Sequence, residues 1–177
     1  MGQNEEFINS LKMEDVPWGQ LSTAYGCAGE FPEHFAVLGA MADRDGMEHA
    51  FGEIAQCIEH QGTLWHCTPF ALIFLVRIYR EAVGRQENKN AVWLTEKLEE
   101  LFAFIVICCE DMEKMAEGGD EDEILPLLSD MLKEEYLWPE DLDEDEQEEL
   151  LENGYQEELF ASCYHYSYEL VREFADE

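Results

Sequence analysis

Residues 68–80 read TPFALIFLVRIYR, and residues 101–109 read LFAFIVICC. The first stretch opens with Thr-Pro, an N-cap residue followed by the proline that a first helical turn tolerates. The second stretch is an uninterrupted apolar run at the end of a helical pattern that starts near Asn90, the residue we expect to cap it. A helix that is apolar all round needs neighbours on several sides. The sequence therefore predicts two largely buried helices at the centre of the fold.

Turn residues divide the rest of the chain into further helices. Prolines stand where helices can begin, Asp43 can cap one helix, and Gly62 can end it because glycine enters the left-handed C-terminal position freely. The predicted boundaries are Pro17, Gly26, Pro32, Asp43, Gly62, Gly118, Gly119, Pro126, Pro139 and Gly154. The pattern predicts about nine helices and no alternating strand. Short connections favour antiparallel neighbours, so we expect a single all-α domain over residues 1–177. It would be either a short α-solenoid of stacked antiparallel hairpins or a globular orthogonal bundle.

Charge is concentrated in the last third of the chain. The 177 residues carry a formal net charge of −32, although 46% of them are hydrophobic, which is too apolar for disorder. Residues 110–177 hold 26 acidic residues against three basic ones, whereas residues 1–109 hold 16 against seven. Binding a phosphate backbone requires Lys and Arg, so nucleic acid is excluded as a direct ligand. The negative electrostatic field of residues 110–177 favours a basic protein as the partner.

Cysteine usage and hydropathy indicate a cytoplasmic protein. The six cysteines contain no CxxC pair and lie in apolar surroundings, which is typical of reduced, buried thiols. The N-terminal MGQNEEF lacks the basic and apolar regions of a signal peptide. The nine-residue apolar run is far shorter than the roughly 20 residues that a bilayer requires, so we expect no membrane span.

Motifs for catalysis or metal binding are weak. Residues 141–145 read DLDED, like the start of an EF-hand loop, but Glu146 stands where the loop needs glycine for its sharp turn. The five histidines include no i, i+4 pair and no HExxH, and the chain has no GxSxG motif, P-loop or dinucleotide fingerprint. We therefore expect a protein that is not an enzyme and that has no cofactor and no metal.

Two acidic blocks are the candidate partner-binding surface. They read DEDE at 120–123 and EDLDEDEQEE at 140–149. Acids at a helix start complement the helix dipole, but that role accounts for only two or three of them. Clustered carboxylates can mimic the spacing of phosphates and speed association with a basic partner. The candidate carboxylates are Asp120, Glu121, Asp122, Glu123, Glu140, Asp141, Asp143, Glu144, Asp145 and Glu148.

The last predicted helix, from about Tyr155 to Ala175, carries two apolar stripes. The stripe that includes Leu159 is the expected core face. Tyr164 and Tyr168 lie on the adjacent stripe, which is either a wider buried face or an exposed aromatic surface. Aromatic anchors with a charged rim are typical of tight interfaces, so Tyr164 and Tyr168 complete the candidate set.

One segment resembles a known family. The residues that carry the resemblance are Trp18, Leu21, Ala24-Tyr25-Gly26-Cys27-Ala28, Phe31-Pro32 and His60-Gln61-Gly62-Thr63. They resemble the W..L..AYG.A..P and HQGT motifs of a bacterial family of HEAT-like helical proteins, and the likeness covers about a third of the chain. It implies a short α-solenoid, which we expect over about residues 1–117. The strongly acidic helical part over about 118–177 lies outside the likeness, so a partner surface there is inferred from charge alone. Members of such families are often immunity proteins encoded beside secreted polymorphic toxins.

These observations together favour an immunity protein. It would bind one cognate secreted toxin, basic and of nuclease type, and neutralise it by stoichiometric occlusion with the acidic surface. Two alternative functions would also use the acidic surface. One is an acidic α-solenoid adaptor or scaffold with many weak partners, and the other is a DNA mimic that inhibits a nucleic-acid-binding protein.

Overall fold

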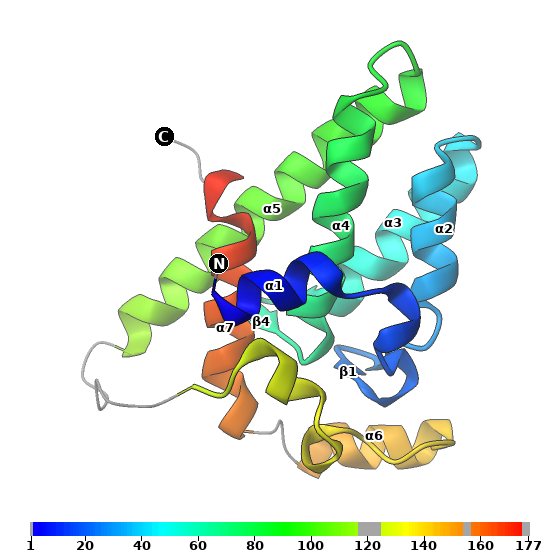
Figure 1. Cartoon of the computed structure of the whole chain (residues 1–177). Coiled ribbons are helices and arrows are strands. Elements are labelled where there is room, and N and C mark those ends of the chain that lie inside the picture. Colours follow the sequence, from blue (N-terminus) through cyan, green and yellow to red (C-terminus); the bar gives the residue numbers. More distant parts are fainter. Residues whose placement is uncertain (1, 117–124, 154–156, 175–177) are drawn as a thin grey trace.

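The computed structural model describes residues 2–116, 125–153 and 157–174, and most of them are helical (Figure 1). The helical class predicted from the sequence is confirmed, with the addition of two short strand pairs. The α-helices are α1 (Gln3–Ser10), α2 (Phe31–Ala40), α3 (Arg44–Ile58), α4 (Cys67–Val83), α5 (Lys89–Ala116), α6 (Glu144–Asn153) and α7 (Glu157–Val171). The strands are β1 (Ser22–Thr23), β2 (Gly26–Cys27), β3 (Glu59–His60) and β4 (Thr63–Leu64). The 3-10 turns are η1 (Met13–Asp15), η2 (Trp18–Gln20), η3 (Leu128–Leu132), η4 (Glu134–Tyr136) and η5 (Arg172–Phe174).

Helices α4, α5 and α7 form the centre of the molecule. α4 and α5 are an antiparallel hairpin, and α7 packs against both of them (Figure 1). Phe70 of α4 and Phe102 of α5 are completely buried, so both helices contribute to the core as predicted. Phe104 and Ile107 of α5 are 45% and 50% exposed, however, so the apolar run at 101–109 is not covered on all sides. The end predicted for α5 at Gly118-Gly119 lies outside the described residues.

A second hairpin, α2–α3, packs beside α4. Trp18 fills the space between them and lies with its ring centroid 5.5 Å from that of Phe35 and 5.7 Å from that of Phe74. The indole N–H of Trp18 donates to the Met13 carbonyl at 3.1 Å, so its polar atom is satisfied although the residue is only 4% exposed.

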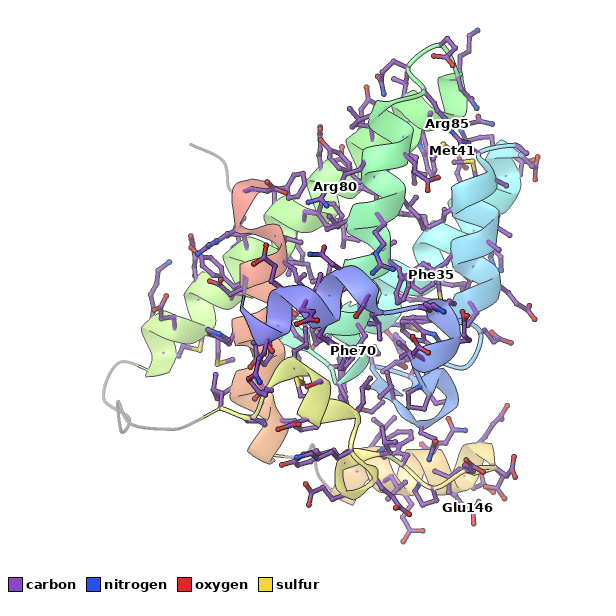
Figure 2. All side chains as sticks on the ribbon, viewed as in Figure 1. Phe35, Met41, Phe70, Arg80, Arg85 and Glu146 are labelled. Atoms are coloured by element: carbon purple, nitrogen blue, oxygen red, sulfur yellow. The ribbon has the colours of Figure 1, made fainter. Side chains whose placement is uncertain are left out.

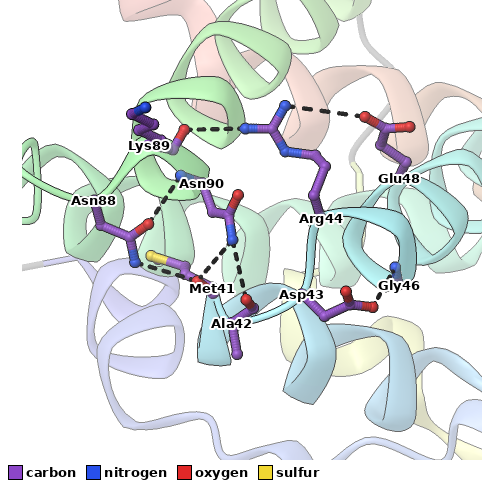
Figure 3. Close-up of polar contacts among 9 residues, drawn as sticks. All are labelled: Met41, Ala42, Asp43, Arg44, Gly46, Glu48, Asn88, Lys89 and Asn90. Atoms are coloured by element: carbon purple, nitrogen blue, oxygen red, sulfur yellow. Dashed lines mark hydrogen bonds and ion pairs between the residues drawn. The ribbon is translucent and has the colours of Figure 1, made fainter.

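Polar side chains join the turns of the two hairpins at one end of the molecule (Figure 3). Asn88 and Asn90 donate from Nδ2 to the Met41 carbonyl at 3.1 and 3.2 Å, and Arg44 donates to the Lys89 carbonyl at 3.1 Å. Carbonyls left free at the end of α2 are thus paired by the neighbouring hairpin. Asn88, rather than the predicted Asn90, caps α5, since its Oδ1 accepts from the Asn90 backbone N–H at 2.8 Å.

Asp43 caps α3 as the sequence predicts, because its carboxylate accepts from the Gly46 N–H at 2.9 Å. The helix start predicted at Thr68-Pro69 is wrong in position, since α4 already begins at Cys67. Thr68 Oγ1 instead donates to the Ile58 carbonyl at 2.6 Å and accepts from the Trp65 N–H at 2.8 Å. This buried hydroxyl therefore links α4 to the end of α3.

Two motif segments that the sequence assigned to helix ends are β-hairpins. Residues 59–64 pair as β3 with β4 around Gln61 and Gly62, whose φ angles are 54° and 83°. A two-residue loop with positive φ at both positions is the type I′ turn, which suits the twist of the flanking strands. β1 and β2 pair around Ala24 and Tyr25, so the helix predicted from Pro17 shrinks to a single 3-10 turn.

The C-terminal part returns over the N-terminal part. The helix predicted after Pro126 consists of the 3-10 turns η3 and η4. Beyond them the Trp138 N–H donates to the Gln20 carbonyl at 3.0 Å, and Gln20 Nε2 donates back to the Trp138 carbonyl at 2.8 Å. This pair of bonds brings α6 to the β1–β2 hairpin, at the edge of the molecule away from the α2–α3 turn (Figure 1).

Candidate partner-binding surface

The second acidic block forms α6 and the turn before it. Asp143 and Glu146 make reciprocal bonds: the Glu146 N–H donates to Asp143 Oδ1 at 2.9 Å, and the Asp143 N–H donates to Glu146 Oε2 at 3.0 Å. This is a capping box, which satisfies two backbone donors at the start of the helix. Two of the acids in this block therefore fix the helix start, and Asp143 is committed to that role.

The other acids of the block face solvent. Glu140, Asp141, Glu144, Asp145 and Glu148 are exposed, and none of them forms an ion pair with a described Lys or Arg. Figure 2 labels Glu146, which lies on α6 at the outer edge of the molecule. We call Glu140, Asp141, Glu144, Asp145 and Glu148 the acidic face. The first predicted block, Asp120, Glu121, Asp122 and Glu123, lies outside the described residues.

α6 reaches the hairpin through a close contact between the Gln147 side chain and the backbone of Gly26. A Cβ built on Gly26 would lie 2.7 Å from Gln147 Oε1, and Gln147 Nε2 donates to the Leu142 carbonyl at 3.0 Å. Beside this contact runs a groove of about 650 Å³. Its lining residues are Ala24, Tyr25, Gly26, Cys27, Gly29, Glu30, Glu144, Gln147, Glu148 and Leu151.

Tyr25 stands at the rim of this groove. Its ring lies at the tip of the β1–β2 hairpin and is 60% exposed. Its hydroxyl lies 3.0 Å from His60 Nδ1, and the two rings meet edge to face with centroids 5.3 Å apart. His60 thus holds the position of an exposed aromatic ring. The Ala-Tyr-Gly turn is the signal that could have predicted this exposure, because hairpin tips lie at the surface.

Tyr164 is not on an exposed stripe, which corrects the interpretation of it as a partner contact. It is only 5% exposed; its hydroxyl donates to the Gly62 carbonyl at 2.8 Å and accepts from the Leu64 N–H at 3.2 Å. Burial raises the pKa of this hydroxyl. Tyr168 is half-buried and packs against the core. The reason is the position of α7, which contacts both α4 and α5 and so needs a wide apolar face.

Buried nucleophiles offer no reactive group. Cys67, Cys108, Cys109 and Cys163 are buried, whereas Cys27 and Cys57 are half-exposed, unlike the burial expected of all six. Burial raises the pKa of Cys108 to about 11 and of Cys109 to about 12, which disfavours the thiolate. Among the described residues, no set of three or more His, Cys, Asp or Glu side chains is placed to hold a metal ion.

Basic side chains are mostly engaged elsewhere. Arg77 donates to the Leu11 carbonyl at 2.7 Å and to the Ile8 carbonyl at 2.6 Å, and it also lies over the Phe74 ring. It thereby pairs the carbonyls at the end of α1 while desolvation lowers its pKa. Arg80 and Arg172 pair with Glu173 and Glu169. The acidic face therefore keeps its charge uncompensated by described cations.

No protein-family model, curated protein or solved structure matches this chain. Within the described residues, every helix is too short or too polar to cross a bilayer.

Proposed function

We propose that this chain is a cytoplasmic immunity protein that binds and neutralises one basic, nuclease-type toxin of the secreted polymorphic class. The observation that supports the proposal best is the acidic face, whose five exposed carboxylates make no ion pair with a described Lys or Arg. Placing like charges together costs free energy through repulsion, and a cationic partner would recover it. We also propose that the two hairpins belong to a short HEAT-like α-solenoid, as the motif resemblance implies.

Inhibition would work by occlusion. Carboxylates on α6 would cover the cationic groove in which a nuclease holds phosphates, so substrate and inhibitor would compete for one surface. Long-range attraction would raise the association rate, and this part of the affinity would fall with ionic strength. Apolar contacts beside the charges would set the lifetime of the complex.

Co-expression tests the proposal. The chain is produced together with the C-terminal domain of the protein that the gene directly upstream encodes. Cell survival is scored, and co-elution of the two proteins is tested in about 0.5 M salt, where exposed charge pairs are largely screened. Rescue with co-elution at one-to-one stoichiometry is the expected result. If the upstream-encoded domain is not toxic and does not bind this chain, the immunity function is rejected. Weak capture of many basic proteins would favour the adaptor or the DNA mimic instead.

A further inference from the structure

We propose that the groove between the β1–β2 hairpin and α6 receives an arginine side chain of the protein partner. The inference rests on the proposed function, because it names the group that the partner would insert beside the acidic face. The groove has a volume of about 650 Å³, which is ample for one extended side chain and the loop that carries it.

Charge identifies the occupant as a cation. Glu30 lines the groove from the loop after β2, and Glu144 and Glu148 line it from α6, one helical turn apart. No Lys or Arg is among the described residues that line it. Three carboxylates around one concave surface, without a compensating base, are complementary to a positive group and repel an anion.

Tyr25 distinguishes arginine from other cations. Its ring is 60% exposed, is positioned by His60, and belongs to the lining of the groove. A guanidinium stacks on a tyrosine face and donates two parallel bonds to a carboxylate, whereas an ammonium is a compact, strongly hydrated charge. Gln147 adds an acceptor at the groove wall, because its Nε2 is bound to the Leu142 carbonyl and its Oε1 faces Gly26.

The first test needs no toxin. Protein with carbon-13 labelled tyrosine rings is titrated with acetyl-Gly-Arg-Gly-amide, with the lysine peptide, and with the neutral citrulline peptide. We expect saturable shifts of the Tyr25 ring resonance with the arginine peptide, binding of the lysine peptide weaker by about threefold to fivefold, and no shift with citrulline. Equal binding of the arginine and lysine peptides, or shifts that grow without saturation on every tyrosine, would overturn the proposal.

Matched variants separate the groove from general charge. Glu144→Gln with Glu148→Gln should abolish the saturable shift of the Tyr25 ring. Tyr25→Leu removes that ring, so its binding is followed by the backbone amide resonance of Cys27, and the saturable shift should be lost there as well. Glu87→Gln with Glu96→Gln changes the net charge equally at exposed positions outside the groove lining and should leave the binding intact. Equal loss in both double variants would mean that only overall charge matters, and the groove would be rejected.

The complex provides the second test. If the upstream toxin domain co-elutes but Tyr25→Leu leaves its dissociation rate unchanged, the arginine site is wrong while the immunity function stands. If the groove binds the arginine peptide but no toxin is neutralised, the proposed function fails while the groove remains a guanidinium site.

Discussion

Gly26 of the β1–β2 hairpin and the Gln147 side chain of α6 lie so close that a Cβ on Gly26 would displace the Gln147 amide. The φ angle of Gly26 is 136°, a region that residues with a Cβ rarely adopt, and a Cβ there would lie 2.7 Å from Gln147 Oε1. α6 therefore packs against a position of the hairpin whose backbone conformation favours glycine.

Gly26→Ala should lower the free energy of unfolding by about 1–3 kcal/mol, because the strained backbone cannot relax although the Gln147 side chain can move aside. Urea denaturation measures the change. Gly52→Ala is the control: nothing lies within 4 Å of a Cβ at this exposed helical position, so alanine should stabilise the protein by about 0.5–1 kcal/mol. A Gly26→Ala protein as stable as wild type would contradict the strain argument.

Tyr164→Phe should cost about 1–3 kcal/mol, because it leaves the Gly62 carbonyl and the Leu64 N–H without the hydroxyl that pairs them. Tyr25→Phe removes a hydroxyl at an exposed ring and should change stability by less than about 0.5 kcal/mol. Thermal and urea unfolding of both variants give the comparison. Similar losses in the two variants would mean that burial of Tyr164 is not what makes its hydroxyl important.

Arg77→Lys should loosen α1. A lysine ammonium cannot make the forked contact to the Ile8 and Leu11 carbonyls, and we expect a loss of about 1–2 kcal/mol at this half-exposed site. Amide hydrogen exchange should accelerate in α1 more than in α5. Arg80→Lys, at an exposed residue with a 3.9 Å ion pair, is the control and should leave α1 exchange unchanged.

Stability should depend on His66 in mild acid. Desolvation by burial lowers its pKa from 6.5 to about 4, and its Nε2 lies 2.8 Å from the Met131 carbonyl. Since the folded pKa lies below the unfolded one, folding favours neutral His66. Its contribution is fully present above pH 6.5 and is lost as the pH falls toward 4.

Relative to His66→Gln, wild type should therefore lose about 2–3 kcal/mol between pH 7 and pH 4.5. Comparing the two proteins cancels the effect of protonating the many carboxylates, which acts on both alike. Urea denaturation at several pH values gives the difference, and parallel stability curves would contradict the prediction.

Neutralising the acidic face should slow toxin binding without unfolding the protein. The variant carries Glu140→Gln, Asp141→Asn, Glu144→Gln, Asp145→Asn and Glu148→Gln, and it keeps Asp143 because that residue caps α6. Asparagine suits position 141, where φ is 59°. Stopped-flow association at low salt should slow by about tenfold or more, with a smaller change in dissociation.

A matched charge variant gives the control for the kinetics. It carries Glu14→Gln, Glu33→Gln, Asp45→Asn, Glu87→Gln and Glu96→Gln, all at exposed positions outside the acidic face. Its association rate should stay much closer to wild type. If the association rate does not change with ionic strength in any variant, electrostatic steering plays no part in the mechanism.

The helical class and the two central helices could be predicted from the sequence because apolar runs such as 101–109 place most of their side chains in the core. The exposure of Phe104 and Ile107 could not, since it depends on where the neighbouring helices end. Turn residues are ambiguous in the sequence. The pattern predicts that Gly62 ends a helix, yet Gly62 shares a two-residue hairpin turn with Gln61, because a glycine with positive φ suits either structure. Only the pairing of Glu59 with Leu64 decides between them, and that pairing is a tertiary outcome.

The acidic face was partly predictable. Exposure of Glu144 and Glu148 follows from their charge, but the burial of Tyr164 depends on where α7 packs. Nothing in the local pattern around Tyr25 places it opposite α6, since residues 26 and 147 meet only in the folded chain. Periodicity can identify a stripe on a helix, whereas the neighbours of that stripe are set by the whole topology.

The packing of α7 against the α4–α5 hairpin also has a consequence during synthesis. About forty residues separate Ala116 from Glu157, so a ribosome that adds about 5–20 residues each second needs roughly 2–8 s to proceed from one to the other. During that interval the apolar side of the α4–α5 hairpin is uncovered on the nascent chain. Until α7 is synthesised, this uncovered apolar side is a surface on which the nascent chain can aggregate or bind a chaperone.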